Sequence, residues 1–151
     1  MATQKCKCSC GHTQFSVKGP AKLRMICHCT ICQKFNGTSF ADILVYQSVK
    51  VSPPAEGVVV FNTYKAPPNV QRGKCSQCGQ AAIEVFNMPL FPKLTMVPVA
   101  MMSGSSELPA INGHMFYEKR CSDAKDDSPK HHGFIASQLA FFKYLWFAKK
   151  G

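Results

Sequence analysis

Seven of the nine cysteines in this 151-residue chain fall into three short groups whose spacing suits thiolate ligands of a zinc ion. The groups are Cys8 with Cys10, Cys27 with Cys29 and Cys32, and Cys75 with Cys78. In KCSQCG a C-x-x-C pair is followed by glycine, which permits the tight turn that wraps a backbone around zinc. The pair in CSCG has the same ending, and each pair supplies only half of a tetrahedral site. We therefore expect the first and last groups to form one closed, structural Zn²⁺ site.

The central stretch CHCTICQKFNG leaves three thiolates for a second metal ion. Catalytic zinc sites keep a fourth position for water or substrate, so Cys27, Cys29 and Cys32 predict an open, catalytic Zn²⁺ site. An alternative partition stays open, in which Cys6 or His28 completes a second closed site. An iron–sulfur cluster is disfavoured because no fourth cysteine follows at a familiar spacing. A thiol–disulfide couple in CTIC is disfavoured because such motifs open a helix within a β-α-β unit, which the flanking sequence does not indicate.

The odd cysteine count and the N-terminal residues favour thiols over disulfides. MATQKCKCSCGH contains no apolar run, so we expect no secretory signal and a cytoplasmic protein, with the nucleus as the alternative compartment. Lys and Arg outnumber Asp and Glu by 18 to 8, giving a net charge of +10. Seven thiolates holding two Zn²⁺ would lower this charge to about +7. The basic residues are scattered in ones and twos, so they are compatible with nucleic-acid binding but do not select it.

The elements that must position these cysteines are predicted to be mainly β-strands. Alternating or β-branched runs predict strands at residues 13–17, 39–46, 58–64, 80–86 and 94–100, the last weakened by Pro98. Turns rich in Pro and Gly separate them. We expect a single zinc-binding domain over residues 1–151, with a mainly β core at about 5–130 and a C-terminal loop and short helix at 131–151.

The C-terminal stretch FIASQLAFFKYLWFAKK carries the helical pattern. Its apolar residues recur at helical spacing, at Ile135, Leu139, Phe142 and Trp146. The stretch is too short, and too interrupted by Lys143, to be a transmembrane segment. We expect a helix docked on the domain. The alternative is a membrane-surface helix, supported by the basic residues Lys143, Lys149 and Lys150.

Three motifs in order, CSCGHTQFSV, CHCTICQKFNGTSF and KCSQCG, resemble the glutathione-dependent formaldehyde-activating enzyme family, which includes centromere protein V. The resemblance covers about residues 5–130, and GHMFYEKRCSDAKDDSPK resembles a subgroup of that family. It implies several coiled antiparallel β-sheets around two Zn²⁺ ions. The structural ion would be held by Cys8, Cys10, Cys75 and Cys78, and the ion at which chemistry is proposed by Cys27, Cys29 and Cys32. The implied activity joins glutathione and formaldehyde into S-hydroxymethylglutathione, within the carbon–sulfur lyases.

Histidines near the cysteines are further candidates for chemistry. His114, Tyr117 and Arg120 in GHMFYEKR could serve a substrate site as acid, phenol and anion anchor, and His114 is the best catalytic candidate. In a regular strand, side chains alternate, so His114 and Tyr117 would lie on opposite faces and all three would not share a site. His28 lies between two predicted ligands, and we expect its ring to point away from the metal.

Other side chains carry weaker expectations. Glutathione needs cationic partners for two carboxylates, and the candidates by charge alone are Lys22, Arg24, Lys34 and Lys65. The loop acids are Asp123, Asp126 and Asp127, and the expected free thiols are Cys6 and Cys121. Phe35 and Phe40 flank Gly37 and could form an apolar wall beside the open site.

Two functions follow from these observations. The first is a zinc-dependent enzyme acting on a glutathione-like thiol adduct, a small-molecule partner. The second is a non-enzymatic zinc module that binds nucleic acid or chromatin through its basic surface. A fourth position free of protein ligands on the central cysteines favours the enzyme, whereas its completion by Cys6 or His28 favours the module.

Overall fold

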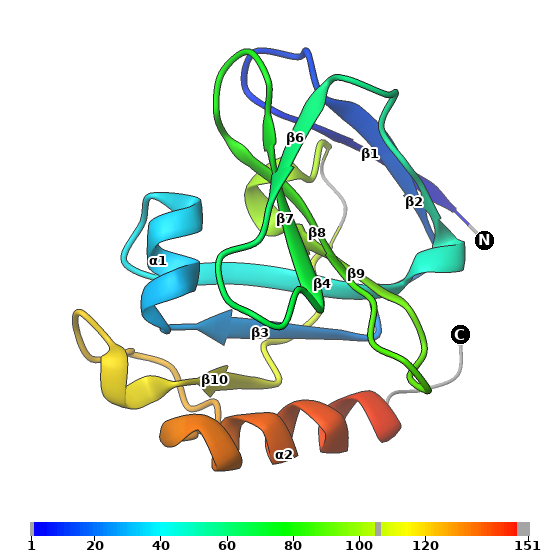
Figure 1. Cartoon of the computed structure of the whole chain (residues 1–151). Coiled ribbons are helices and arrows are strands. Elements are labelled where there is room, and N and C mark those ends of the chain that lie inside the picture. The colour runs from blue at the N-terminus through cyan, green and yellow to red at the C-terminus, as the bar shows by residue number, and fades with distance from the viewer. Residues whose placement is uncertain (1, 105–106, 148–151) are drawn as a thin grey trace.

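The computed structural model describes residues 2–104 and 107–147, and these form two β-sheets and two α-helices (Figure 1). The smaller sheet is antiparallel, with strand order β1-β2-β5. Its strands are β1 (Thr3–Lys7), β2 (Gln14–Lys18) and β5 (Val51–Ser52). The short β5 follows a single 3₁₀ turn, η1 (Ser48–Lys50). The prediction of a mainly β chain is confirmed.

The larger sheet has seven strands in the order β10-β3-β4-β9-β8-β7-β6. In chain order these are β3 (Leu23–Cys27), β4 (Ala41–Gln47), β6 (Val59–Asn62), β7 (Val70–Cys75), β8 (Ala81–Phe86), β9 (Leu94–Pro98) and β10 (Gly113–Met115). All neighbours are antiparallel except β10 and β3, which run parallel with Met115 opposite Cys27. This parallel pair departs from the expected all-antiparallel arrangement, and it brings the carboxyl ends of β3 and β10 to the same edge.

Each of the five predicted stretches overlaps a strand, but β1, β3, β5, β7 and β10 were not among the predicted runs. Strands β3 and β7 contain Arg24 and Arg72, and these charged residues interrupt the apolar pattern that predicts a strand. The sheet accommodates each arginine because a carboxylate on the neighbouring strand pairs with it. Pro98 is the last residue of β9, where a missing N–H ends the strand instead of breaking it.

Two apolar cores flank the sheets. One lies between the small sheet and the middle of the large sheet and includes Phe15, Leu44 and Val97. The other lies under the C-terminal helix and includes Leu23, Ile43 and Leu94. Two further 3₁₀ turns, η2 (Val99–Met101) and η3 (Tyr117–Lys119), follow β9 and β10.

The predicted C-terminal helix is present as α2 (Gly133–Trp146), which crosses beneath β10 and β3 in Figure 1. It is docked through the buried Ser137 and Ala140, and the Ser137 Oγ accepts a hydrogen bond of 2.8 Å from the Phe116 N–H. The predicted apolar stripe does not make this contact, since Ile135, Leu139 and Trp146 are all exposed. Lys149 and Lys150 lie outside the described residues. No helix in the described ranges is long and apolar enough to cross a membrane.

Candidate metal centres

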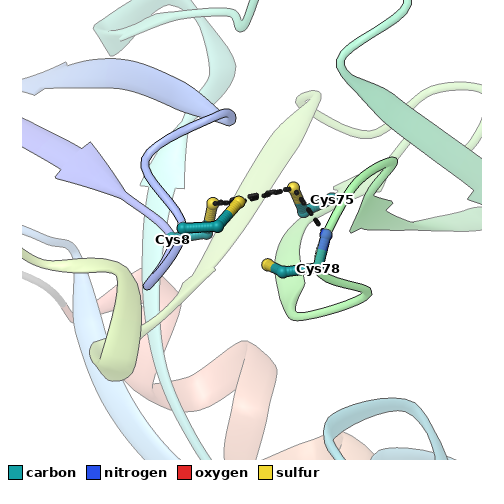
Figure 2. A group of neighbouring side chains, drawn as sticks. Cys8, Cys75 and Cys78 are labelled. Atoms are coloured by element: carbon teal, nitrogen blue, oxygen red, sulfur yellow. Dashed lines mark hydrogen bonds between the residues drawn. The ribbon is translucent and has the colours of Figure 1, made fainter.

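Cys8, Cys10, Cys75 and Cys78 come together where the turn after β1 meets the turn after β7 (Figure 2). Their sulfur atoms all lie within 4.8 Å of one another. Cys8 Sγ is 3.4 Å from Cys10 Sγ and 3.6 Å from Cys75 Sγ, and Cys10 Sγ is 3.7 Å from Cys75 Sγ. Four sulfurs at 2.3 Å from one tetrahedral ion would be separated by about 3.8 Å. The cluster is therefore close to the size that Zn²⁺ requires, and it can hold a metal ion.

Backbone N–H groups point at three of the sulfurs in and near these turns. Thr13 N–H is directed at Cys8 Sγ at 3.4 Å, His12 N–H at Cys10 Sγ at 3.5 Å, and Cys78 N–H at Cys75 Sγ at 3.5 Å. Gly11 and Gly79, each one residue after a pair, have φ of 78° and 73°, the left-handed region that favours glycine. The turns expected from the C-x-C-G and C-x-x-C-G spacings are thus present, and N–H donors of this kind stabilise thiolates over thiols.

The pKa of Cys75 reflects this arrangement. Burial raises it, but hydrogen bonds from the backbone N–H groups of Cys78 and Gln77, from Thr13 and from the Cys8 thiol outweigh that effect and lower the pKa to about 5. At neutral pH the cluster therefore holds at least one thiolate before any metal binds, and a thiolate is the form of cysteine that binds metal.

Cys27, Cys29 and Cys32 form a second cluster, with all three sulfurs within 4.8 Å. Cys27 ends β3, Cys29 is the N-cap of α1 (Thr30–Asn36), and Cys32 lies in its first turn. The Cys29 Sγ is 3.4 Å from Cys27 Sγ and accepts a hydrogen bond from the Cys32 N–H at 3.3 Å. Bonds from the thiols of Cys27 and Cys32 outweigh burial and lower the pKa of Cys29 to about 3. The trio can hold a metal ion through a preformed thiolate.

Cys6 and His28, the two residues considered as a fourth ligand, are not part of the three-cysteine cluster that the described residues form. Cys6 lies on the small sheet, with its Sγ 3.6 Å from Met102 Sδ. His28 follows Cys27 but its ring nitrogens lie outside the group of mutually close ligand atoms. Helix α1, which was not predicted, does begin at CTIC. It connects β3 to β4, however, and these strands are antiparallel, so the β-α-β context typical of thiol–disulfide couples is absent there.

His28, His114 and Asp126 form a hydrogen-bonded chain beside the trio. The His28 Nε2 is 2.8 Å from His114 Nδ1, and the His114 Nε2 is 2.9 Å from Asp126 Oδ1. A carboxylate only accepts hydrogen bonds, so with neutral imidazoles His114 donates through Nε2 and His28 does the same. This order leaves the His28 Nδ1 as an acceptor. It is buried and has no hydrogen-bond partner among the described residues.

The surroundings favour a neutral His28 at one end of this hydrogen-bonded chain and an ionised Asp126 at the other. Burial, together with the neighbouring His114, lowers the pKa of His28, which favours its neutral form. Hydrogen bonds from His114 and Ser128 hold the pKa of Asp126 well below its usual range. Asp126 had been assigned only as a loop acid, and its sequence distance from the cysteines gave no signal of this contact.

His114, Tyr117 and Arg120 do gather in one place, so the alternation argument against a shared site was wrong. The ring centroids of His114 and Tyr117 are 5.6 Å apart, and the Arg120 guanidinium carbon lies 4.4 Å from the Tyr117 ring centroid. The reason is local: β10 ends at Met115, and Phe116 has φ of 53°, which turns the chain back on itself. The ring centroids of His28 and Tyr117 are 5.2 Å apart, with the two rings nearly perpendicular. The Nε2 of His28 faces His114, and the ring nitrogens of His28 are not among the mutually close ligand atoms of the trio.

An ion pair behind the trio had no signal in the sequence. Arg72 on β7 faces Glu84 on β8, with Nε 2.9 Å from Oε1, and the Glu84 side chain is only 3% exposed. The Arg72 charge also helps to lower the pKa of Cys29.

Of the cationic candidates for glutathione, Arg24 is engaged by Asp42 through two hydrogen bonds of 2.9 and 2.7 Å. Cys121 is an exposed free thiol.

A mainly β chain with two separate thiolate clusters defines a protein of the cysteine-rich metal-site class. Residues 3–119 match the sequence model of the family described as glutathione-dependent formaldehyde-activating enzyme. This match spans more than half of the chain, and the chain therefore belongs to that family. Membership connects it with glutathione-linked activation of formaldehyde. No curated protein matches the chain.

Proposed function

We propose that the chain is a zinc-dependent enzyme of the carbon–sulfur lyase type that forms S-hydroxymethylglutathione or a similar thiol adduct. The observation that carries the proposal is a cluster of three cysteines with no fourth Cys, His, Asp or Glu ligand among the described residues. A closed four-cysteine cluster elsewhere supplies the structural role. Two Zn²⁺ per chain would then be present, one closed and one open.

Zinc bound by Cys27, Cys29 and Cys32 would supply an electrophilic centre that holds a thiolate sulfur or polarises a carbonyl oxygen. The reaction itself is an addition. The glutathione sulfur bonds to the carbonyl carbon of formaldehyde, the carbon–oxygen π bond breaks, and the proton of the thiol ends on the new hydroxyl oxygen. No oxidant or reductant is needed, so the chain must provide only a site for the sulfur and a path for one proton.

His28 is the residue to which we assign the proton. Buried polar atoms are almost always hydrogen-bonded, so the unpartnered Nδ1 of His28 requires a donor from outside the described side chains. The thiol of glutathione or the hydroxyl of the adduct is such a donor. His114, the predicted catalytic histidine, acts through His28, because its own nitrogens are occupied by His28 and Asp126. It is therefore a positioning residue in this proposal.

A metal count on Cys32→Ser, with Cys121→Ser as the matched control, tests the partition. We expect the wild-type and Cys121→Ser proteins to hold two zinc ions and Cys32→Ser to hold one, with an unchanged far-ultraviolet circular dichroism spectrum. Formation of S-hydroxymethylglutathione above the spontaneous rate should be lost in Cys32→Ser only. A wild-type protein that holds two ions but gives no rate above the spontaneous one would refute the enzyme while leaving the metal sites in place.

His114→Gln separates the role of the histidine chain from that of the metal. We expect this variant to keep two zinc ions but to lose about 10²-fold or more in kcat, because His28, the proton acceptor, would no longer be held in the tautomer that leaves its Nδ1 free. The ¹⁵N chemical shifts of His28 should show Nδ1 unprotonated in the wild type and a mixture of tautomers in the variant. An unchanged His28 tautomer together with an unchanged kcat would remove the histidine chain from the mechanism.

A further inference from the structure

The outward face of α2 carries apolar side chains where a surface helix normally carries polar ones. Ile135 and Leu139 are one turn apart and are 73% and 67% exposed, and Trp146 is 84% exposed two turns further along. The inward face already has its contacts, through Ser137 and Ala140. The exposed stripe therefore does not stabilise the described fold, and burying it against a partner would be favourable.

A loop beside α2 extends this surface. The segment between β8 and β9 lies against the C-terminal half of the helix in Figure 1, and the ring centroids of Phe91 and Phe142 are 5.5 Å apart. Leu90, in that loop, is fully exposed and has φ of 68°, a backbone conformation that is uncommon for a bulky side chain. We call the surface formed by Leu90, Phe91, Ile135, Leu139, Trp146 and Phe147 the apolar face.

The two segments that form the apolar face carry charges of one sign, and the nearest acid that α2 contacts is Glu118, which accepts the Gly133 N–H at the start of the helix. Neither residues 87–93 nor residues 133–147 contain an Asp or Glu, while both contain a lysine, Lys93 and Lys143. Lys65 adds a third cation, with its Nζ 5.5 Å from the ring centroid of Phe134 at the start of α2. An apolar stripe whose own segments carry cations and no acid is complementary to a surface that is anionic outside and apolar beneath.

We propose that the apolar face docks on a membrane surface rich in anionic phospholipid, with α2 lying in the plane of the interface. The net charge of +10 favours this partner over a second copy of the chain, since two such copies repel each other. Trp146 suits the head-group region, where tryptophan side chains are enriched. The metal clusters do not take part in this contact, so the proposal stands independently of the enzyme function.

Trp146 is the only tryptophan in the chain and reports on this contact directly. The full-length, zinc-loaded protein would be titrated with vesicles of phosphatidylcholine containing about one third phosphatidylserine, and with vesicles of phosphatidylcholine alone. We expect a blue shift of the tryptophan emission and co-sedimentation with the anionic vesicles only. Both should weaken as the salt concentration rises, because screening removes the lysine contribution.

Leu139→Glu and Leu90→Glu test the two halves of the face, and Val49→Glu is the matched control. Val49 is an apolar residue that is 88% exposed on η1, outside the apolar face. We expect each face variant to lower the partition coefficient about tenfold or more, and the control to lower it much less. Equal zinc content and circular dichroism spectra show that all variants are folded.

Three results would overturn the proposal. The first is the absence of any blue shift with anionic vesicles. The second is equal partition of Leu139→Glu and Val49→Glu. The third is a concentration-dependent dimer without vesicles that Leu139→Glu converts to a monomer, since a second copy of the chain would then cover the face.

Discussion

Replacing Arg72 by methionine should expose how strongly the sheet behind the trio depends on one buried ion pair. Arg72 and Glu84 are directly opposite each other on β7 and β8, and the Glu84 side chain is 3% exposed. In Arg72→Met the carboxylate keeps its burial and loses its partner. Breaking a buried pair from one side destabilises a protein by about 3–5 kcal/mol. That is a large part of a total stability of about 5–15 kcal/mol.

Urea unfolding followed by circular dichroism measures this loss. With a slope of about 2 kcal/mol per molar urea, the midpoint should fall by about 2 M. Arg24→Met is the matched control, because its pair with Asp42 is more exposed, with side-chain exposures of 17% and 25%. The control should lose about 1 kcal/mol. All proteins would be compared at the same excess of zinc.

The sign of the pH dependence follows from Glu84. Burial raises its pKa even with Arg72 present, and without Arg72 the pKa must rise further. A carboxyl group with a raised pKa in the folded state binds more protons there than in the unfolded state. Its contribution to stability is therefore fully present at low pH and is lost as the pH rises through the folded-state pKa. The deficit of Arg72→Met should be larger at about pH 8 than at about pH 6. A loss no greater than that of Arg24→Met, equal at both pH values, would refute this reasoning.

Three further predictions concern single positions. Gly73→Ala should lower the melting temperature by about 5 °C or more, because a Cβ there would lie 2.9 Å from Phe61 Cε1 in the sheet. Ser137→Ala should destabilise the chain by about 1–2 kcal/mol in urea unfolding, since the Phe116 N–H loses its acceptor. In metal-free protein, iodoacetamide should modify Cys29 at a rate that barely changes between about pH 6 and about pH 8, because its pKa of about 3 keeps it a thiolate throughout. A rate that rises tenfold per pH unit would contradict the last prediction.

Ligand counting predicted which cysteines come together, because ligand type and turn spacing are local properties. The pairs Cys8–Cys10 and Cys75–Cys78 each carry their own turn and glycine, and a tetrahedral ion needs two such pairs. The strands containing charged residues were harder to predict. In β7 a period-2 pattern is interrupted by Arg72, whose partner Glu84 is visible only once β7 and β8 are paired.

The histidine chain was beyond reach of the sequence for a similar reason. His28 and His114 are 86 residues apart, and they meet because β10 pairs parallel with β3. Nothing in the residues around position 114 specifies that pairing. The left-handed conformation of Phe116, which brings Tyr117 back beside His114, is also unusual for an aromatic residue. The alternation of side chains therefore holds within β10, which ends at Met115, but it does not extend through Phe116 to Tyr117.

The two cysteine clusters differ most in the sequence separation between their cysteines, and this difference indicates different roles. Cys8 and Cys75 are 67 residues apart and lie at the junction of the two sheets, so a metal ion there closes a long loop and binds only the folded chain. The trio spans a single strand end and the first turn of α1, and the N–H donor of that turn is in place without any distant contact. If the trio holds a metal ion, we expect its loss to have little effect on the rest of the fold. A site whose ion is not needed for folding is free to use that ion for chemistry.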